Sequence, residues 1–179
     1  GLSSRDEAKL TALRERAEAQ ALNGRWREAQ DLWQQVIALD ADHADSHFQL
    51  ATSLENLGEF ALARSHYERA LDLDGLRFRA DTRINAIIER VAREYDSSNV
   101  SFVHSSKGFD RASAPYAPGW DLLVEHVHYD FSGNAVLARI FARAIARHLS
   151  PTTPPKLLQP KEVAARIGFP NHETIENLK

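Results

Sequence analysis

The chain has 179 residues, 43% of them hydrophobic, which suffices for one large or two small domains with a packed core. Its formal net charge of −3 gives no long-range attraction for nucleic acid or an anionic membrane, and no window approaches ~18 consecutive apolar residues, so neither a nucleic-acid partner nor a membrane-spanning segment is expected. The absence of cysteine excludes disulfides, thiolate nucleophiles and cysteine-ligated metals within these residues, and the compartment stays undetermined.

The first predicted helix begins just after Ser3. This serine is a candidate N-cap, and Asp6 and Glu7 place acidic groups in the first turn, where the partial positive charge of a helix N-terminus favours them. We therefore expect a helix from about residue 5 to Asn23.

Residues 24–40 and 58–74 are two copies of one unit, which recurs at a fixed offset of 34 residues. The matched pairs are Gly24 and Gly58, Trp26 and Phe60, Ala29 and Ala63, Trp33 and Tyr67, Leu39 and Leu73, and Asp40 and Asp74. A period of this length is typical of a pair of antiparallel helices. The glycines would end the first helix of a pair, the alanines would let the second helix approach closely, and the aromatic residues would fill the space between them. The copies therefore predict a second helix from residue 25 or 26 and a further pair over 44–57 and 59–73.

This pattern resembles the tetratricopeptide repeat family over roughly residues 8 to 75. In the second copy the family pattern appears as Leu50-Ala51, Gly58, Phe60, Ala63, Tyr67, Ala70 and Gly75. The first copy departs from it, because Arg16 and Val36 occupy positions that the family usually makes small and apolar, and Ala41 replaces the terminal proline. The resemblance implies stacked helix pairs that act as a protein-interaction module.

By the geometry of that family, a concave groove lined by the first helix of each pair would accept a peptide or a partner helix. The groove positions that the resemblance implies are Arg14, Glu18, Phe48, Thr52, Glu55 and Asn56. This mixture lacks the basic, asparagine-rich clamp with which some relatives hold C-terminal carboxylates, so a chaperone tail is not the expected ligand. The open alternative is that these residues are merely exposed and that the repeats serve as a spacer.

A fifth helix is predicted over 79–95. Ile84, Ile87, Ile88 and Val91 recur at helical spacing, and their apolar face would cover the open end of the repeat stack. We thus expect five antiparallel helices up to residue 95. Four aromatic residues are expected to be substantially buried between them: Trp26, Trp33, Phe60 and Tyr67.

The composition changes at the turn-forming run 96–99, where a second module begins. Residues 100–104 alternate in the manner of a short strand, and 105–120 carry two glycines and two prolines, which predicts an ordered loop. An amphipathic helix follows, with Val136, Leu137, Ile140, Phe141, Ala144, Ile145 and Leu149 on one face, and it must end before Pro151. We expect the strand to pack against this helix as the remnant of an α/β layer. A stiff linker over 151–155 and a short helix over 160–167 complete the chain.

Glu125, His126, His128 and Asp130 form the one cluster of titratable groups with a recognisable spacing. In the simplest interpretation it is a polar surface loop before a helix. In a second interpretation, alternate residues of an extended segment would aim His126 and His128 at one metal ion, although two ligands do not make a site. The sequence predicts no metal site and no cofactor. A third interpretation of this cluster rests on resemblance to a known family.

The acid-x-x-His spacing ahead of Phe131-Ser-Gly-Asn134 and a closing helix is similar to the last conserved block of the SGNH (GDSL-type) hydrolases. This resemblance implies that His128 is the general base for a serine and that Glu125 orients it. Residues 76–85 look like the connecting helix of bacterial members that carry tetratricopeptide helices. However, Glu125 replaces the usual aspartate, and no Gly-Asp-Ser or oxyanion block occurs in the chain, so these residues alone should not hydrolyse esters.

Together these features predict a mainly α fold with three parts. Residues 1–95 would form tetratricopeptide-like repeats with a capping helix, 96–150 a partial hydrolase-like segment with a small α/β remnant, and 151–179 a proline-rich linker with a short helix. The start at Gly1 without methionine resembles a tag remnant, so we expect a fragment of a larger bacterial protein. The favoured function is a scaffold or interaction module with a protein or peptide partner. The alternative is the C-terminal part of a serine esterase whose nucleophile lies upstream.

Overall fold

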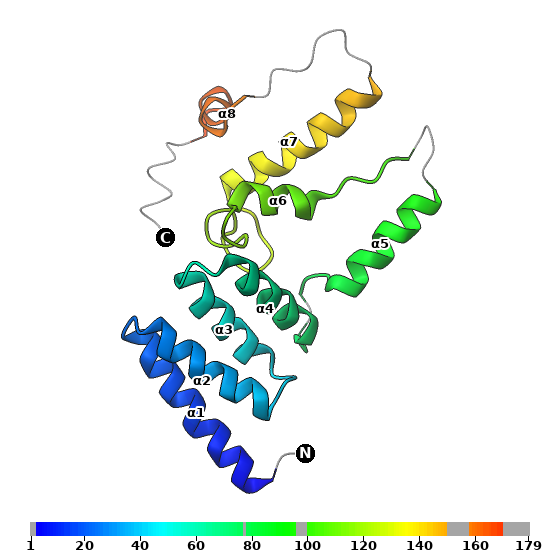
Figure 1. The fold of residues 1–179 in the computed structure, drawn as a ribbon. Helices are drawn as coiled ribbons and strands as arrows, with labels where there is room; N and C mark the ends of the chain where they lie inside the picture. The colour runs from blue at the N-terminus through cyan, green and yellow to red at the C-terminus, as the bar shows by residue number, and fades with distance from the viewer. Residues whose placement is uncertain (1–2, 77, 96–99, 150–157, 170–179) are drawn as a thin grey trace. The chain divides into compact units, whose positions relative to one another are not determined.

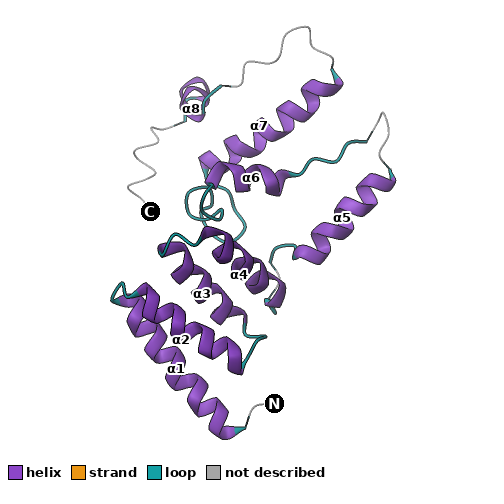
Figure 2. Cartoon of the chain, in the orientation of Figure 1, coloured by secondary structure: helices purple, strands orange, loops and turns teal. Residues whose placement is uncertain are grey.

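A computed structural model describes residues 3–76, 78–95, 100–149 and 158–169, and within these ranges the secondary structure is helical, with no strand (Figures 1 and 2). The helices are α1 (Ser4–Leu22), α2 (Trp26–Leu39), α3 (Ala44–Asn56), α4 (Phe60–Leu73), α5 (Thr82–Glu94), α6 (Ser105–Ser113), α7 (Phe131–His148) and α8 (Pro160–Ile167). The predicted turn at 96–99 and the predicted linker at 151–155 lie outside the described residues. No described helix is long and apolar enough to cross a bilayer.

The chain divides into two compact units. The first consists of the residues up to Val91 together with Pro115–Ala117, and the second consists of Ala92–Ala114 and the residues from Pro118 onward. The segment Pro115–Ala117 therefore belongs, by its contacts, to the repeat unit rather than to the unit that flanks it in the sequence.

Both copies of the repeat end their first helix in the same way. Gly24 has a φ of 69° and Gly58 a φ of 77°, in the left-handed region where a side chain is strained. After each glycine the chain folds back onto the helix that it leaves, because the Arg25 and Glu59 amides donate to the carbonyls of Gln20 and Leu54, each at 2.9 Å. The 34-residue offset thus corresponds to one repeated backbone closure, as the sequence predicts.

The core of the first unit lies between consecutive helices, since α1 packs on α2, α2 on α3 and α3 on α4. Its buried apolar members are Leu10, Leu13, Ala17, Ala29, Leu32, Trp33, Val36, Leu50, Leu54 and Ala63. The repeated alanines, Ala29 and Ala63, are buried, as expected of residues that allow the helices to approach closely. Of the four aromatic residues expected to be substantially buried, Trp33 is completely buried, and Trp26, Phe60 and Tyr67 are mostly buried but keep part of their surface in solvent.

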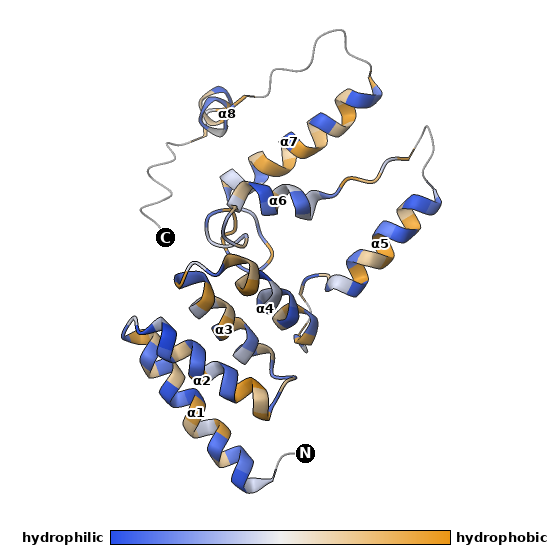
Figure 3. Cartoon of the chain, in the orientation of Figure 1, coloured by the Kyte–Doolittle hydropathy of each residue, from blue (hydrophilic) through white to orange (hydrophobic). Residues whose placement is uncertain are grey.

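The prediction that the fifth helix covers the end of the stack is wrong for the described residues. No residue of α5 is buried, and the side chains of its apolar face are 39–49% exposed: Ile84, Ile87, Ile88 and Val91. In Figure 3 the helix carries hydrophobic and hydrophilic stripes along its length. Its first turn is held by polar bonds instead, because the Thr82 amide and hydroxyl donate to the carboxylate of Asp72 at 3.0 and 2.8 Å. The helix forms as predicted, but its apolar face is only partly covered by the described residues.

The second unit is built on the packing of α6 against α7. The predicted strand over 100–103 is wrong, and no α/β remnant is present in the described residues, because the segment after residue 100 is irregular and leads directly into α6. The predicted loop over 105–120 is also wrong in its first half. Three of the four glycine and proline residues in that range lie after Ser113, where α6 ends. These residues led to the prediction of a loop, but they do not interrupt the helix. Helix α8 occupies the range where a short helix was expected, and Phe169 beyond it stacks on Phe131 with ring centroids 4.6 Å apart.

Candidate functional site

The segment that carries Glu125 and His128 is a tight loop ahead of α7. Leu123 and Tyr129 form an isolated antiparallel bridge across its base. The Val124 amide donates to the carbonyl of His128 at 2.9 Å, and the Asp130 amide donates to the carbonyl of Leu122 at 3.0 Å. These bonds place the residues 125–128 at the tip of the loop.

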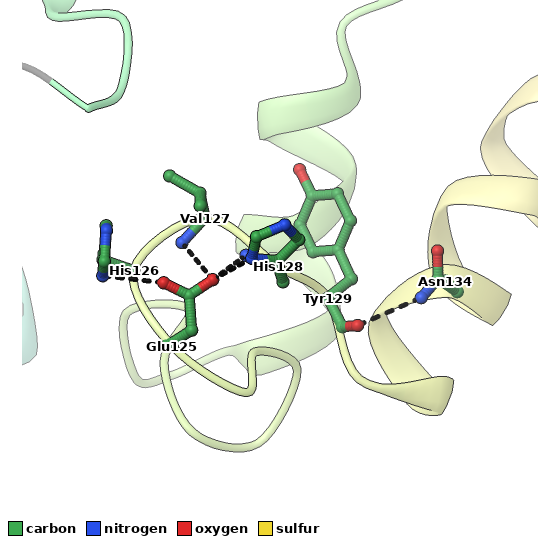
Figure 4. A network of polar contacts seen from close by, with 6 residues as sticks. All are labelled: Glu125, His126, Val127, His128, Tyr129 and Asn134. Carbon is green, nitrogen blue, oxygen red and sulfur yellow. Dashed lines mark hydrogen bonds and ion pairs between the residues drawn. The ribbon is translucent and has the colours of Figure 1, made fainter.

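The carboxylate of Glu125 is the centre of this tip (Figure 4). One oxygen accepts hydrogen bonds from the backbone amides of Val127, at 3.4 Å, and His128, at 2.8 Å, and it also contacts Nδ1 of the His128 ring. The other oxygen lies 2.7 Å from Nδ1 of His126. Partial desolvation by itself raises the pKa of Glu125, but the hydrogen bonds from His128, the nearby His126 and the Val127 amide outweigh it, so the pKa lies below its ordinary value.

This arrangement fixes what each histidine can do. Because Nδ1 of His128 faces a carboxylate, its Nε2 remains the atom that could accept a proton from another group, and the side chain is 80% exposed. His126 lies against the opposite oxygen, so the two histidines flank the carboxylate rather than converge on one point (Figure 4). Among the described residues, no group of three or more histidine, cysteine, aspartate or glutamate side chains could hold a metal ion. The two histidines therefore do not converge as the metal interpretation requires, and the catalytic roles of His128 and Glu125 stay predictions.

The Ser-Gly-Asn run after the loop has a structural role of its own. The side chain of Asp130 caps α7 by accepting from the Gly133 amide at 2.8 Å. A Cβ atom at Gly133 would stand 2.1 Å from the carbonyl oxygen of Leu122, so only glycine fits against the base of the loop. The Asn134 side chain donates to the carbonyl of Tyr129 at 3.1 Å (Figure 4). These contacts tie the Glu125–His128 loop to the start of the helix.

The predicted groove positions of the second copy lie along one face of α3, at the spacing of successive helical turns. Phe48 is 50% exposed and meets the ring of Tyr67 edge-on, with centroids 5.4 Å apart. The hydroxyls of Thr52 and Tyr67 are 3.4 Å apart. Burial raises the pKa of Tyr67, the Thr52 hydrogen bond opposes this, and the charge of Glu55 adds to it. We call Phe48, Thr52, Glu55 and Tyr67 the groove strip.

The remaining predicted groove positions are less connected to this strip. Asn56 donates its side-chain amide to the carbonyl of Thr52 at 2.8 Å, so it bonds within its own helix. Arg14 of α1 forms an ion pair with Asp45 at the start of α3, at 3.3 Å. Glu18 is exposed. The binding roles of these residues stay predictions.

Two residues that the sequence did not single out lie at the end of the groove strip, where Ala117 contacts Glu55 of the strip and Tyr116 contacts Phe60 of α4 beside it. The ring of Tyr116 meets Phe60 edge-on, with centroids 5.1 Å apart and an interplanar angle of 80°. The Ala117 amide donates to the side chain of Glu55 across 3.5 Å. The prolines at 115 and 118 mark this short segment in the sequence. Its contact partners, Phe60 and Glu55, lie more than fifty residues earlier, and no local sequence pattern indicates that they meet it.

Comparison with known proteins bears on the repeats alone. Residues 44–76 match the model of the family described as tetratricopeptide repeat. Neither the curated proteins nor the solved structures gave a match to this chain. Together with the packed helix pairs, the family match supports a tetratricopeptide repeat protein, and repeats of this kind suggest a protein-interaction module.

Proposed function

We propose that the first unit binds an extended peptide or a partner segment along the groove strip of α3 and α4. The observation that carries this proposal is Phe48, an aromatic side chain left half exposed on a helix face whose next turns present Thr52 and Glu55. Aromatic side chains, phenylalanine included, are enriched at protein interfaces relative to the rest of the protein surface.

The neighbours of Phe48 keep its ring in place before any ligand arrives. Its edge-on contact with Tyr67, and the contact of Tyr67 with Thr52, join two helices whose packing is part of the core. A ligand would therefore meet an ordered surface and would spend little binding energy on ordering side chains. Glu55 at the end of the strip offers an acceptor for backbone amides of an extended chain.

Selection of random peptides displayed on phage tests this proposal directly. Peptides that bind the 179-residue chain are then measured by fluorescence anisotropy against the variant with Phe48→Ala and Thr52→Ala. We expect binding to weaken by about ten-fold or more, because a central aromatic contact is lost. The matched control is Gln34→Ala, an exposed position of α2, which should leave the affinity unchanged. If no peptide is selected, or if the groove variant binds as well as the control, the repeats act as a spacer.

A second candidate function rests on the contact between Glu125 and His128. We propose that, in a complete protein with an upstream serine nucleophile, His128 acts as general base and Glu125 fixes its tautomer. Two observations support it: the exposure of His128, and the loop, closed by the Leu123–Tyr129 bridge, that holds the two side chains in contact. The fragment origin and the ester substrate of such a protein are part of the same proposal.

The complete protein, assayed on a small acyl ester, provides the test. His128→Ala should lower kcat by about 10³-fold or more, because serine, base and acid act as a unit. Glu125→Gln should lower it less, because the amide keeps the shape of the loop. His126→Ala is the matched control, since it removes the histidine on the other carboxylate oxygen and should leave kcat near the wild-type value. Absence of ester hydrolysis, or equal rates for the two histidine variants, would make the loop purely structural.

A further inference from the structure

We infer that the groove strip, together with Phe60 beside it, selects peptides with an aromatic residue next to proline, and that Pro115–Ala117 of the same chain occupies the end of this surface as a competing internal ligand. This inference rests on the proposed binding function of the strip and adds the chemistry of the partner. Its basis is that three residues distant in sequence belong to the compact repeat unit through their contacts.

The contacts of this segment use an aromatic ring beside the strip, that of Phe60, and the acceptor at the end of the strip, Glu55. The Tyr116 ring packs edge-on against Phe60 at the first turn of α4, which is a preferred geometry for aromatic pairs. The next residue, Ala117, turns its backbone amide toward the Glu55 carboxylate at the last turn of α3. An aromatic side chain and a backbone donor on consecutive residues are therefore bound by two different helices.

The prolines on either side prepare the segment for this role. Proline fixes its own φ and drives the residue before it into an extended conformation, and Ala114, which precedes Pro115, has φ −53° and ψ 138°. Ala117 precedes Pro118 and is subject to the same restriction. An extended segment restricted in this way loses little conformational entropy when it binds, which is the advantage of proline-rich ligands.

The internal segment covers only the end of the strip. Tyr116 is 53% exposed and contacts Phe60, and its neighbour Ala117 reaches Glu55, whereas Phe48 lies two helical turns away from Glu55 along α3 and remains half exposed. An external peptide with the same aromatic–proline chemistry could contact the whole strip once it displaced Tyr116. The internal segment benefits from its high effective concentration, so it raises the concentration of external peptide that binding requires.

The experiment uses a synthetic peptide with the sequence of residues 113–119, Ser-Ala-Pro-Tyr-Ala-Pro-Gly, titrated into the 179-residue chain. Binding is followed by amide NMR up to millimolar peptide, a range suited to a ligand with few contacts. We expect the peptide to bind the Tyr116→Ala chain at least about five-fold more tightly than the wild-type chain, because the aromatic pair with Phe60 no longer competes. A peptide in which the tyrosine is replaced by alanine is the control and should not bind either chain.

A second variant separates the site from a general effect of the substitution. Phe60→Ala added to Tyr116→Ala should remove the gain in affinity, and Phe102→Ala, a partly buried aromatic of the second unit, should not. Equal binding of the peptide to wild-type and Tyr116→Ala chains, or no binding to either, would overturn this inference. If phage selection yields peptides that depend on Phe48 but lack an aromatic–proline pair, the proposed function stands and only this inference fails.

Discussion

The two copies of the repeat share a backbone and a residue pattern, yet their aromatic residues have different surroundings. Trp33 in the first copy is completely buried, whereas Tyr67 at the same position of the second copy is only partly buried. The difference comes from the neighbours, because α3 packs on α2 and covers Trp33, and no described helix packs in the corresponding way on α4. A repeat position therefore defines which way a side chain points, and the next helix decides whether solvent reaches it.

A second difference between the copies is chemical. Leu13 and Leu32 are buried apolar residues of the first copy, and the residues at the same offset in the second copy are His47 and His66. The Nδ1 atoms of the two histidines are 2.9 Å apart, and Nε2 of His47 lies 3.1 Å from the carbonyl oxygen of Ala41. Because a carbonyl only accepts, Nε2 of His47 carries hydrogen, and in the neutral pair its Nδ1 accepts from His66. Burial first, and the charge of His47 second, lower the pKa of His66.

The largest expected effect concerns the covered aromatic position. Trp33→Ala should lower the free energy of unfolding by about 3–5 kcal/mol, because it leaves a large cavity between α2 and α3. Tyr67→Ala should cost roughly half of that or less, since part of its ring is already in solvent. Urea denaturation followed by circular dichroism compares the two. Equal losses would show that a further helix covers α4 in solution.

The alanine positions test the part of the packing that lies within each copy. Ala29→Leu and Ala63→Leu should each destabilise the chain by about 1–3 kcal/mol, because both residues are buried at a close helix contact. Ala61→Leu, at an exposed position of α4, is the matched control and should have little effect. Thermal unfolding measures all three. A much smaller loss for Ala63 than for Ala29 would mean that the second copy is loosely packed throughout.

Substitutions at the glycines test whether the two copies end their first helix with the same backbone conformation. Gly24→Ala and Gly58→Ala should each cost about 1–2 kcal/mol, because both residues have positive φ, and neither new methyl group would meet another atom. Gly75→Ala, where φ is not in that region and the space is also open, should be nearly neutral. Urea denaturation measures the three variants. Unequal costs at the two repeat positions would contradict the identity of their helix closures.

The smallest expected effect is a pH dependence confined to the second copy. Because the pKa of His66 is lowered in the folded protein, the unfolded chain binds this proton more readily. His66 therefore contributes its full stabilisation of the folded state when the pH is above 6.5, the ordinary pKa of histidine. This contribution declines as the pH falls through 6.5 toward the lower pKa of the folded protein. The double variant His47→Leu and His66→Leu, which copies the first repeat, should flatten this decline in urea denaturation between about pH 7.5 and pH 5. His148→Leu, at the exposed end of α7, is the control, and an unchanged slope in the double variant would contradict the assignment.

The second unit illustrates how far local sequence signals reach. The resemblance to the hydrolase block predicts that Glu125 lies beside His128, and the two side chains do meet, because residues three apart in a tight loop cannot separate far. Their role in catalysis stays a prediction. The helix over Ser105–Ser113 was missed, since its stability depends on packing against α7, and the glycine and proline content of the region described only the loop that follows it.

The sequence by itself determined the repeated helix pairs, the glycine closures and the alanine contacts, because each depends on residues within one helix or one turn. Tertiary structure alone decided that α5 presents its isoleucines to solvent, that His47 meets His66, and that Tyr116 lies on Phe60. These outcomes depend on which surfaces meet across many residues of chain. Helical periodicity shows that a face is apolar, but it contains no information about which partner, if any, will cover that face.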